Sequence, residues 1–216
     1  IIGEKDACGV GFIANIKGVE SNWILKQSLK GLNCMEHRGG CGGDSDSGDG
    51  AGILCSIPWN YLEKKVNLKN KKKYDKGLGM IFMPNKNEKI EECKSICEEE
   101  AEKLSINKTS WRTVPVNNEI LGPLAKANAP FICQWILFID KKDSIDVERL
   151  LFQLRKRIEK KIRESFKNHV GNCEFYFASL SSKTVVYKGM VRSEILSEFY
   201  QDLKEESFKV SFSVYH

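Results

Sequence analysis

The amino-acid sequence predicts a mixed α/β protein, in which layers of helices cover sheets. Segments rich in β-branched and aromatic residues alternate along the chain with segments of helical periodicity. A length of 216 residues is enough to bury a large core. A composition of 41% hydrophobic and 29% charged residues is typical of a folded, soluble protein. No internal repeat or linker divides the chain, so we expect one globular unit.

The expected strands are short β-branched or aromatic runs between turn-forming residues. They cover residues 10–16, 50–57, 77–83, 110–116, 131–139, 174–180, 184–187 and 208–215. Only the polar run 181–183 separates two of these strands, so we expect a hairpin there. This run, Ser-Ser-Lys, is interpreted as a polar turn and not as a catalytic serine–lysine pair.

The expected helices carry apolar residues three and four positions apart. They cover residues 23–35, 58–62, 87–104, 144–168 and 194–203. The longest has an apolar stripe at intervals of four residues, formed by Leu150, Leu154, Ile158, Ile162 and Phe166. Such a stripe predicts that this helix packs against a sheet.

Charge and hydropathy exclude two classes of function. The net charge is +5, but Lys and Glu alternate in segments such as 88–94 and 159–164, so no single basic face is expected. The run 71–73 is interpreted as a solvated loop because no aromatic residues accompany its lysines as a base-stacking platform would require. No apolar run approaches the ~20 residues that span a bilayer. We expect neither nucleic-acid binding nor membrane insertion.

The cysteines form no paired framework. They lie at positions 8, 34, 41, 55, 93, 97, 133 and 173, which favours reduced thiols. Cys93 and Cys97 are one helical turn apart, and we interpret them as the inner face of a helix because no second ligand pair lies nearby. A metal-binding or electron-transfer module that uses Cys34, Cys41 and Cys55 is an alternative.

Three ordered motifs point to a nucleophile facing a glycine-rich wall. Residues 8–14 read Cys-Gly-Val-Gly-Phe-Ile-Ala, which places Cys8 at the start of a strand. Glycines beside it, such as Gly11, allow backbone and ligand to approach closely. Residues 35–40 read Met-Glu-His-Arg-Gly-Gly, and residues 46–52 read Asp-Ser-Gly-Asp-Gly-Ala-Gly.

The thiol needs a base because a free cysteine, with a pKa of about 8.5, is largely protonated at neutral pH. The histidines have no local motif that ties them to this thiol; they are His37, His169 and His216. An α-amino group with a pKa near ~7.7–8.0 can accept the proton if Cys8 becomes the first residue. Residues 1–7 are therefore interpreted as a propeptide, with a solvated flank as the alternative.

The loop after the second motif has several interpretations. Arg38 is followed by two glycines and is either a hydrogen-bonding hub for loop carbonyls or a group that orients the pocket near the nucleophile. Asp44, Asp46 and Asp49 could bind a metal, but the glycines among them favour a tight loop. Residues 39–52 do not form a phosphate-binding loop, because the Gly-Lys-Ser/Thr ending is missing and a helix precedes them.

These motifs resemble one family. Residues 8–14, 35–43 and 46–52 are similar to the N-terminal class II glutamine amidotransferase domain of glutamate synthases of the large-subunit or ferredoxin-dependent type. Residues 175–190 resemble the same family, whereas residues 60–130 match it loosely. The third and last stretches favour glutamate synthases over the class II amidotransferases of purine, amino-sugar or asparagine synthesis, which remain an alternative.

The resemblance implies a fold and a site. The implied fold is of the α+β class, a four-layer αββα sandwich of the N-terminal nucleophile hydrolase type over residues 8–216, incomplete at its C-terminus. Cys8 is the implied nucleophile, with its own α-amino group as the base. The residues implied to bind substrate or to orient the site are Arg38, Gly39, Asp49 and Gly50.

The resemblance also implies a reaction. Glutamine is hydrolysed to glutamate and ammonia, and the ammonia passes to a synthase domain that converts 2-oxoglutarate to glutamate. That domain uses FMN, an iron–sulfur cluster and electrons from ferredoxin or a nicotinamide donor. We expect no cofactor or metal in the present residues, and a location in the bacterial cytoplasm or the plastid stroma.

Two motifs of the family are missing from the sequence. They are an Arg-Phe-Ser-Thr block and an Asn-Gly pair, which in relatives bind glutamine and the oxyanion. We therefore expect the sequence to be a fragment that is inactive alone. A noncatalytic domain that docks onto a partner enzyme is the other alternative.

Overall fold

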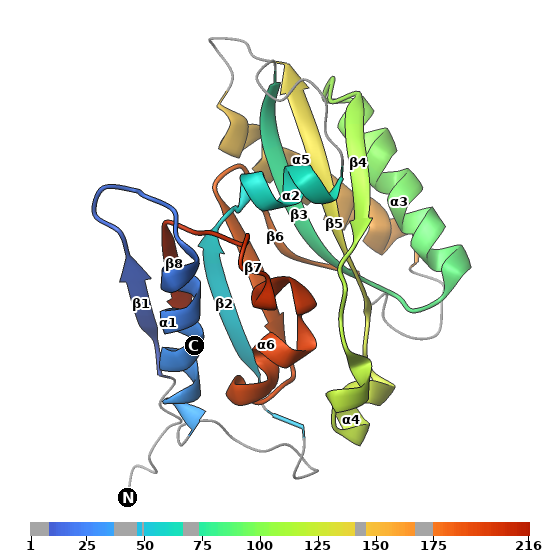
Figure 1. Ribbon diagram of the computed structural model, residues 1–216. Coiled ribbons are helices and arrows are strands. Elements are labelled where there is room, and N and C mark those ends of the chain that lie inside the picture. The colour runs from blue at the N-terminus through green and yellow to red at the C-terminus, as the bar shows by residue number, and fades with distance from the viewer. Residues whose placement is uncertain (1–8, 37–46, 49, 67–73, 141–145, 167–174) are drawn as a thin grey trace, which may run out of the picture. The chain divides into compact units, whose positions relative to one another are not determined.

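The computed structural model describes residues 9–36, 47–48, 50–66, 74–140, 146–166 and 175–216 (Figure 1). The chain forms two compact units, and each contains one four-stranded sheet. The first unit comprises Ile1–Tyr61, Pro115–Asn128 and Val186–His216. The second comprises Leu62–Val114 and Ala129–Val185. Strands and helices alternate along the described chain, which confirms a mixed protein of helices and sheets.

The first sheet has the strand order β1-β8-β2-β7. Its strands are β1 (Gly11–Ala14), β8 (Phe212–Tyr215), β2 (Ala51–Ser56) and β7 (Thr184–Gly189). Antiparallel pairing joins β8 to both β1 and β2, so the chain's last strand lies beside its first. The sheet is therefore assembled from segments that are far apart in sequence.

Helix α1 (Asn22–Asn33) packs beside β1 and β8 (Figure 1). It begins after Ser21, whose hydroxyl accepts a hydrogen bond from the Ile24 backbone N–H at 3.4 Å and so satisfies one free donor of the first turn. Ile24, Leu25 and Leu32 of the helix are buried. This apolar face explains why the segment is helical and why it covers the sheet.

The second sheet has the strand order β4-β5-β3-β6. Its strands are β4 (Lys108–Thr113), β5 (Phe131–Asp140), β3 (Tyr74–Met83) and β6 (Tyr176–Ser181). The central pair runs antiparallel over ten residues of each strand, from Tyr74 opposite Asp140 to Met83 opposite Phe131. Both central strands are rich in the apolar residues that a buried sheet requires.

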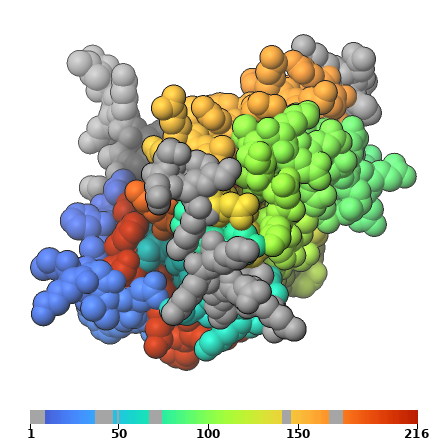
Figure 2. Space-filling view, turned by 90° about the horizontal axis from the view of Figure 1, so that it is seen from above, coloured from blue at the N-terminus to red at the C-terminus, as the bar shows by residue number. Residues whose placement is uncertain are grey.

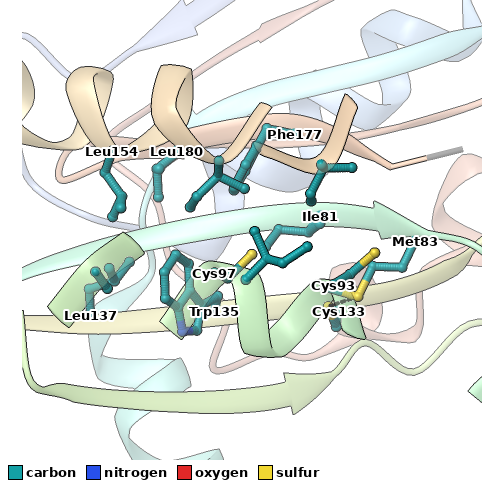
Figure 3. Close-up of a cluster of buried hydrophobic side chains, with 14 of the residues drawn as sticks. Ile81, Met83, Cys93, Cys97, Cys133, Trp135, Leu137, Leu154, Phe177 and Leu180 are labelled. Atoms are coloured by element: carbon teal, nitrogen blue, oxygen red, sulfur yellow. Dashed lines mark hydrogen bonds between the residues drawn. The ribbon is translucent and has the colours of Figure 1, made fainter. Parts of the chain in front are cut away.

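Two long helices, α3 (Asn87–Glu102) and α5 (Val147–Ser165), pack beside each other and against this sheet. Their apolar faces meet alternate strand residues such as Trp135, Leu137 and Phe177 in one buried cluster (Figure 3). The predicted stripe of α5 is confirmed from Leu154 onward. In its first turn Leu151 is buried and Leu150 only partly so, because a spacing of exclusively four residues drifts around a helix of 3.6 residues per turn.

Sulfur atoms gather in the core of the second unit. Cys93 and Cys97 lie on the buried face of α3, as the helical interpretation predicted. The Cys133 thiol lies 3.9 Å from the Met83 sulfur in the same cluster (Figure 3). Burial raises the pKa of the Cys133 thiol to about 12 and that of Cys97 well above its usual value. These thiols are therefore packing groups and not nucleophiles.

The predicted hairpin at 181–183 is wrong. Strand β6 pairs with β3 in the second sheet, whereas β7 belongs to the first sheet beside β2. Glu148, in the first turn of α5, accepts hydrogen bonds from the Ser182 backbone N–H at 2.5 Å and the Ser182 hydroxyl at 2.6 Å. The Ser181 hydroxyl accepts from the Thr184 N–H at 3.2 Å. These polar bonds make the expected turn, but it carries the chain from one sheet to the other.

The predicted helix at 194–203 is also interrupted. Residues Ser193–Ile195 form a 3₁₀ turn, α6 spans Leu196–Phe199, and a second 3₁₀ turn spans Gln201–Lys204. The break falls at Tyr200, whose φ of −90° and ψ of 101° are extended. The buried Tyr200 hydroxyl donates to the Lys188 carbonyl at 2.7 Å, which holds this break against the end of β7.

Two further short helices complete the described chain. Helix α2 spans Trp59–Lys65 and confirms the helix expected after Pro58. Helix α4 spans Pro123–Ala127, follows a 3₁₀ turn at Asn118–Ile120, and was not predicted because it is a single turn. None of the described helices has the length and apolarity needed to cross a bilayer.

Candidate active site

Most of the predicted site lies outside the described residues. Cys8, Arg38, Gly39 and Asp49 fall there, whereas Gly50 is described. Other residues named by the sequence analysis also fall there: residues 1–7 and 71–73, His37, Cys41, Asp44, Asp46, His169 and Cys173. What the structure describes is the framework on either side of these residues.

The framework converges at one end of the first sheet. β1 begins at Gly11, three residues after Cys8, and Gly11 lies opposite Tyr215 near the end of β8. His216 and Gly52 exchange backbone hydrogen bonds of 2.9 and 3.1 Å at the start of β2. The start of β1, the end of β8 and the start of β2 therefore lie at the same end of the sheet. The sequence motifs that begin at Cys8 and end at Gly52 lead into this end.

The Tyr215 ring occupies the space beside two glycines. A Cβ atom built on Gly11 would lie 2.5 Å from Tyr215 Cε2, and one built on Gly31 would lie 2.7 Å from Tyr215 Cζ. Gly11 is on β1 and Gly31 is on α1, so one aromatic ring fits against both elements. The expectation that Gly11 admits a ligand is therefore corrected, because the space beside it is filled by a side chain of the protein.

The third motif lies closely against the residues that end and follow β7. Gly50 has a φ of +137°, a conformation that side-chain-bearing residues rarely adopt, and a Cβ on it would lie 3.6 Å from the Gly189 carbonyl. A Cβ on Gly52 would lie 3.0 Å from Lys188 Cβ, and one on Gly48 would lie 2.6 Å from Arg192 N. The described glycines of this motif thus pack closely against the end of β7 and the residues that follow it, and we call Gly48, Gly50 and Gly52 the glycine wall.

Sequence reasoning missed the residues that hold the ends of the segment 37–46. The Glu36 carboxylate accepts a hydrogen bond from the Ser193 backbone N–H at 3.0 Å and another from the Ser193 hydroxyl. The buried Ser47 hydroxyl accepts from the Ala125 N–H at 3.2 Å. The available signal was the position of Glu36 directly before His37, inside the second motif.

The two described cysteines of the proposed metal module differ in environment. Cys34 is exposed just after α1, whereas Cys55 is fully buried on β2. Desolvation raises the pKa of the Cys55 thiol to about 12, which keeps it protonated at neutral pH. Over the described part of the chain, no three His, Cys, Asp or Glu side chains are grouped to hold a metal ion.

A buried polar network supports the first unit. Asp202 is fully buried and accepts hydrogen bonds from the Tyr61 hydroxyl at 2.7 Å and the Tyr187 hydroxyl at 3.2 Å. Tyr187 lies on β7 and Tyr61 on α2, so the carboxylate joins elements that are far apart in sequence. Because its hydrogen-bonding partners are themselves buried, this network has a structural role.

Comparison with known proteins gives a consistent result. The family model of class-II glutamine amidotransferases matches residues 8–216. The chain is 44% identical over its whole length to ferredoxin-dependent glutamate synthase 1, chloroplastic/mitochondrial, of Arabidopsis thaliana. It is 43% and 42% identical, again over its whole length, to the ferredoxin-dependent glutamate synthases of Oryza sativa subsp. japonica and Synechocystis sp.. The chain spans only 13–14% of the length of these relatives.

The family match begins at residue 8, the cysteine that the sequence analysis singled out, and runs through the described framework to residue 216. The match covers Gly9, β1 with its first residue Gly11, the glycine wall and both sheets. The chain belongs to the class-II glutamine amidotransferases.

Proposed function

We propose that this chain is the glutaminase part of a ferredoxin-dependent glutamate synthase and hydrolyses glutamine to glutamate and ammonia. The observation that carries the proposal is the match that starts at Cys8 within a chain 42–44% identical to such synthases. The convergence of the starts of β1 and β2 with the end of β8 supports it, because the described chain enters β1 at the same end of the sheet as the glycine wall.

The proposed chemistry uses the terminus of the mature chain. The α-amino group of Cys8 accepts the thiol proton, and the sulfur attacks the side-chain amide carbon of glutamine. The tetrahedral oxyanion collapses as the C–N bond breaks, and the leaving nitrogen takes the proton to give ammonia and a γ-glutamyl thioester. Water then attacks the thioester, releases glutamate and returns the proton to the sulfur. Each oxyanion donor in a comparable site contributes roughly 2.7–4 kcal/mol.

The proposal assigns roles to the residues around the nucleophile. Residues 1–7 are removed as a propeptide so that the α-amino group of Cys8 is free. Arg38, Gly39, Asp49 and Gly50 bind glutamine or orient the site. The described φ of Gly50 supports its place in this set, since the backbone there needs glycine.

The proposed architecture is the four-layer αββα sandwich. On the second sheet, α3 and α5 cover one face, yet Leu78, Met80 and Ile136 on the opposite face are fully buried too. Burial of both faces is what a sheet inside a sandwich requires. On the first sheet, α1 lies on the side of Gly11, whereas Phe12 on the other face of the edge strand β1 is 75% exposed. Figure 2 shows the N-terminal part of the described chain, in blue, at the surface.

The remaining activity belongs to the longer protein of which we propose this chain is a part. In that protein, the ammonia released from glutamine passes to a synthase domain that aminates 2-oxoglutarate. That domain uses FMN and an iron–sulfur cluster, and ferredoxin is its electron donor. We assign none of these groups to the present residues. The names of the relatives place some of them in chloroplasts, and we propose a plastid or a bacterial cytoplasm for this protein.

The test is active-site labelling of the full-length protein with the glutamine analogue diazo-oxo-norleucine. Peptide mapping should find the label on Cys8 as the first residue, and Cys8→Ala should abolish glutamine-dependent activity but keep activity with ammonium. Cys34→Ala, which removes an exposed thiol, is the control and should be labelled and active. Label on another cysteine, or full glutaminase activity with residues 1–7 attached, would overturn the proposal.

A further inference from the structure

Glu36 holds the chain directly before the segment that carries Arg38. Its Oε2 accepts a hydrogen bond from the Ser193 N–H at 3.0 Å and from the Ser193 hydroxyl. Its Oε1 lies 3.9 Å from Nε of Arg192, whose guanidinium also pairs with Glu194. One carboxylate thus receives two donors from a single residue and lies beside a cation, an arrangement that fixes both its position and its direction.

The chain just after that segment also lies against the residues that follow β7. A Cβ atom on Gly48 would lie 2.6 Å from Arg192 N and 2.6 Å from the Val191 carbonyl carbon, so only glycine fits there. Residues 36 and 48 therefore both lie against residues 191–193, although 11 residues separate them in the sequence. We call Glu36, Gly48 and residues 191–193 the loop clamp.

The loop clamp belongs to the end of the first sheet where the glycine wall lies. Residues 191–193 follow β7, which ends at Gly189, and a Cβ on Gly50 would lie 3.6 Å from the Gly189 carbonyl. The clamp, the wall and all the contacts between them lie within the first unit. The described residues on both sides of the segment 37–46 are thus held against the residues that follow β7.

We propose that Glu36 is a positioning residue for glutamine: through its bonds to Ser193 it fixes the point from which the chain reaches Arg38. This inference rests on the proposed function, in which Arg38 binds glutamine or orients the site. Glu36 itself does not touch the reacting atoms. Its loss should weaken glutamine binding more than it slows the chemical step, because the pre-organisation of the site is lost.

The experiment measures glutamine-dependent and ammonium-dependent glutamate formation by the full-length protein. In Glu36→Ala the KM for glutamine should rise about tenfold, as expected for the loss of charge-assisted hydrogen bonds, with kcat changed less than about twofold. Glu36→Gln keeps an oxygen acceptor for the Ser193 N–H and should recover most of the affinity. Ser193→Ala, which removes the hydroxyl donor, should raise KM by a smaller factor.

The matched control is Glu206→Ala. Glu206 pairs with Lys26 of α1 at 2.5 Å and is largely exposed, so this variant also removes an ion pair from the first unit. It should leave KM and kcat unchanged. Activity with ammonium, which bypasses the glutaminase site, should be the same in every variant and reports that the protein is folded.

The outcomes separate this inference from the proposed function. If Cys8→Ala abolishes glutamine-dependent activity while Glu36→Ala leaves the KM for glutamine unchanged, the positioning role is wrong and the function stands. If Glu36→Ala lowers kcat at unchanged KM, and the loss matches the fraction of unfolded protein, then Glu36 has a purely structural role. This result would also overturn the positioning role. If Cys8→Ala retains glutaminase activity, the proposed function itself fails.

Discussion

Arg157 of α5 donates a hydrogen bond from Nε to Oε2 of Glu100 on α3 at 2.8 Å, and this pair joins the two long helices of the second unit. Lys103 donates to the other carboxylate oxygen at 2.5 Å. The Glu100 side chain is only 7% exposed, whereas both cations are about half exposed. The carboxylate is thus the buried member of the network, and its loss should matter more than that of either cation.

Glu100→Gln should lower the free energy of unfolding by about 1–2 kcal/mol, since it removes the charge that two donors share near the surface. Chemical denaturation followed by tryptophan fluorescence measures this change in the free energy of unfolding. Glu206→Gln, at an exposed pair, should cost less than about 0.5 kcal/mol. Equal effects of the two substitutions would contradict the network's contribution.

The same network predicts a pH dependence. Hydrogen bonds from Lys103, followed by those from Arg157, hold the pKa of the Glu100 carboxyl below its usual value despite burial. A carboxyl with a lowered folded-state pKa stabilises the protein above its unfolded-state pKa, and this stabilisation is lost as the pH falls through the folded-state pKa. The stability difference between wild type and Glu100→Gln should therefore be largest near neutral pH and shrink on acidification. A difference that is constant with pH would refute this linkage.

Gly31→Ala should destabilise the first unit by about 1–3 kcal/mol, because the new methyl group overlaps the Tyr215 ring. Gly189→Ala is the matched control: its Cβ would lie 3.7 Å from a Val191 methyl group, an ordinary contact. Thermal unfolding of both variants measures the difference. In the background of Tyr215→Ala the cost of Gly31→Ala should fall sharply, and a strictly additive double variant would contradict the packing argument.

Cysteine alkylation should divide the described thiols into two classes. Cys34 is exposed and should react with iodoacetamide in the native protein within minutes, whereas Cys55 and Cys133 are buried. Burial raises the pKa of each of these two thiols to about 12, so they lack both access and thiolate at pH 8. Mass spectrometry of peptides gives the extent of labelling, and unfolding in denaturant should make all thiols react. Native labelling of Cys55 at the rate of Cys34 would disprove its burial.

Glu148→Ala should destabilise the second unit by about 1–3 kcal/mol, because the Ser181 and Ser182 groups that donate to this carboxylate lose their acceptor. Glu148→Gln keeps one oxygen acceptor and should cost less. Hydrogen exchange should show faster opening at the end of β6 in the alanine variant. Unchanged protection there would mean that the bend does not depend on Glu148.

The sequence predicted strands and helices well where their own residues decide them. Each of the eight expected strands is present, and the helices at 87–104 and 144–168 match α3 and α5 within a few residues over the described chain. The apolar periodicity of these segments is local information. Which strands share a sheet is not local, and so the polar run 181–183 was read as a hairpin although Glu148 turns it toward another sheet.

The candidate site, too, was predictable only where local residue types decide its structure. The motif around Cys8 and the glycines up to Gly52 are visible in the sequence, because nucleophile chemistry and tight backbone turns select residue types. The contacts that place them are between residues distant in sequence. Glu36 meets Ser193, and Gly31 meets Tyr215, only in the folded chain.

The position of β1 in its sheet bears on how the chain would mature. β1 is an edge strand, and its first rung with β8 is at Gly11, three residues beyond Cys8. Cutting the peptide bond before Cys8 would break none of the described pairs between β1 and β8. The proposed removal of residues 1–7 would therefore leave the pairing between β1 and β8 intact.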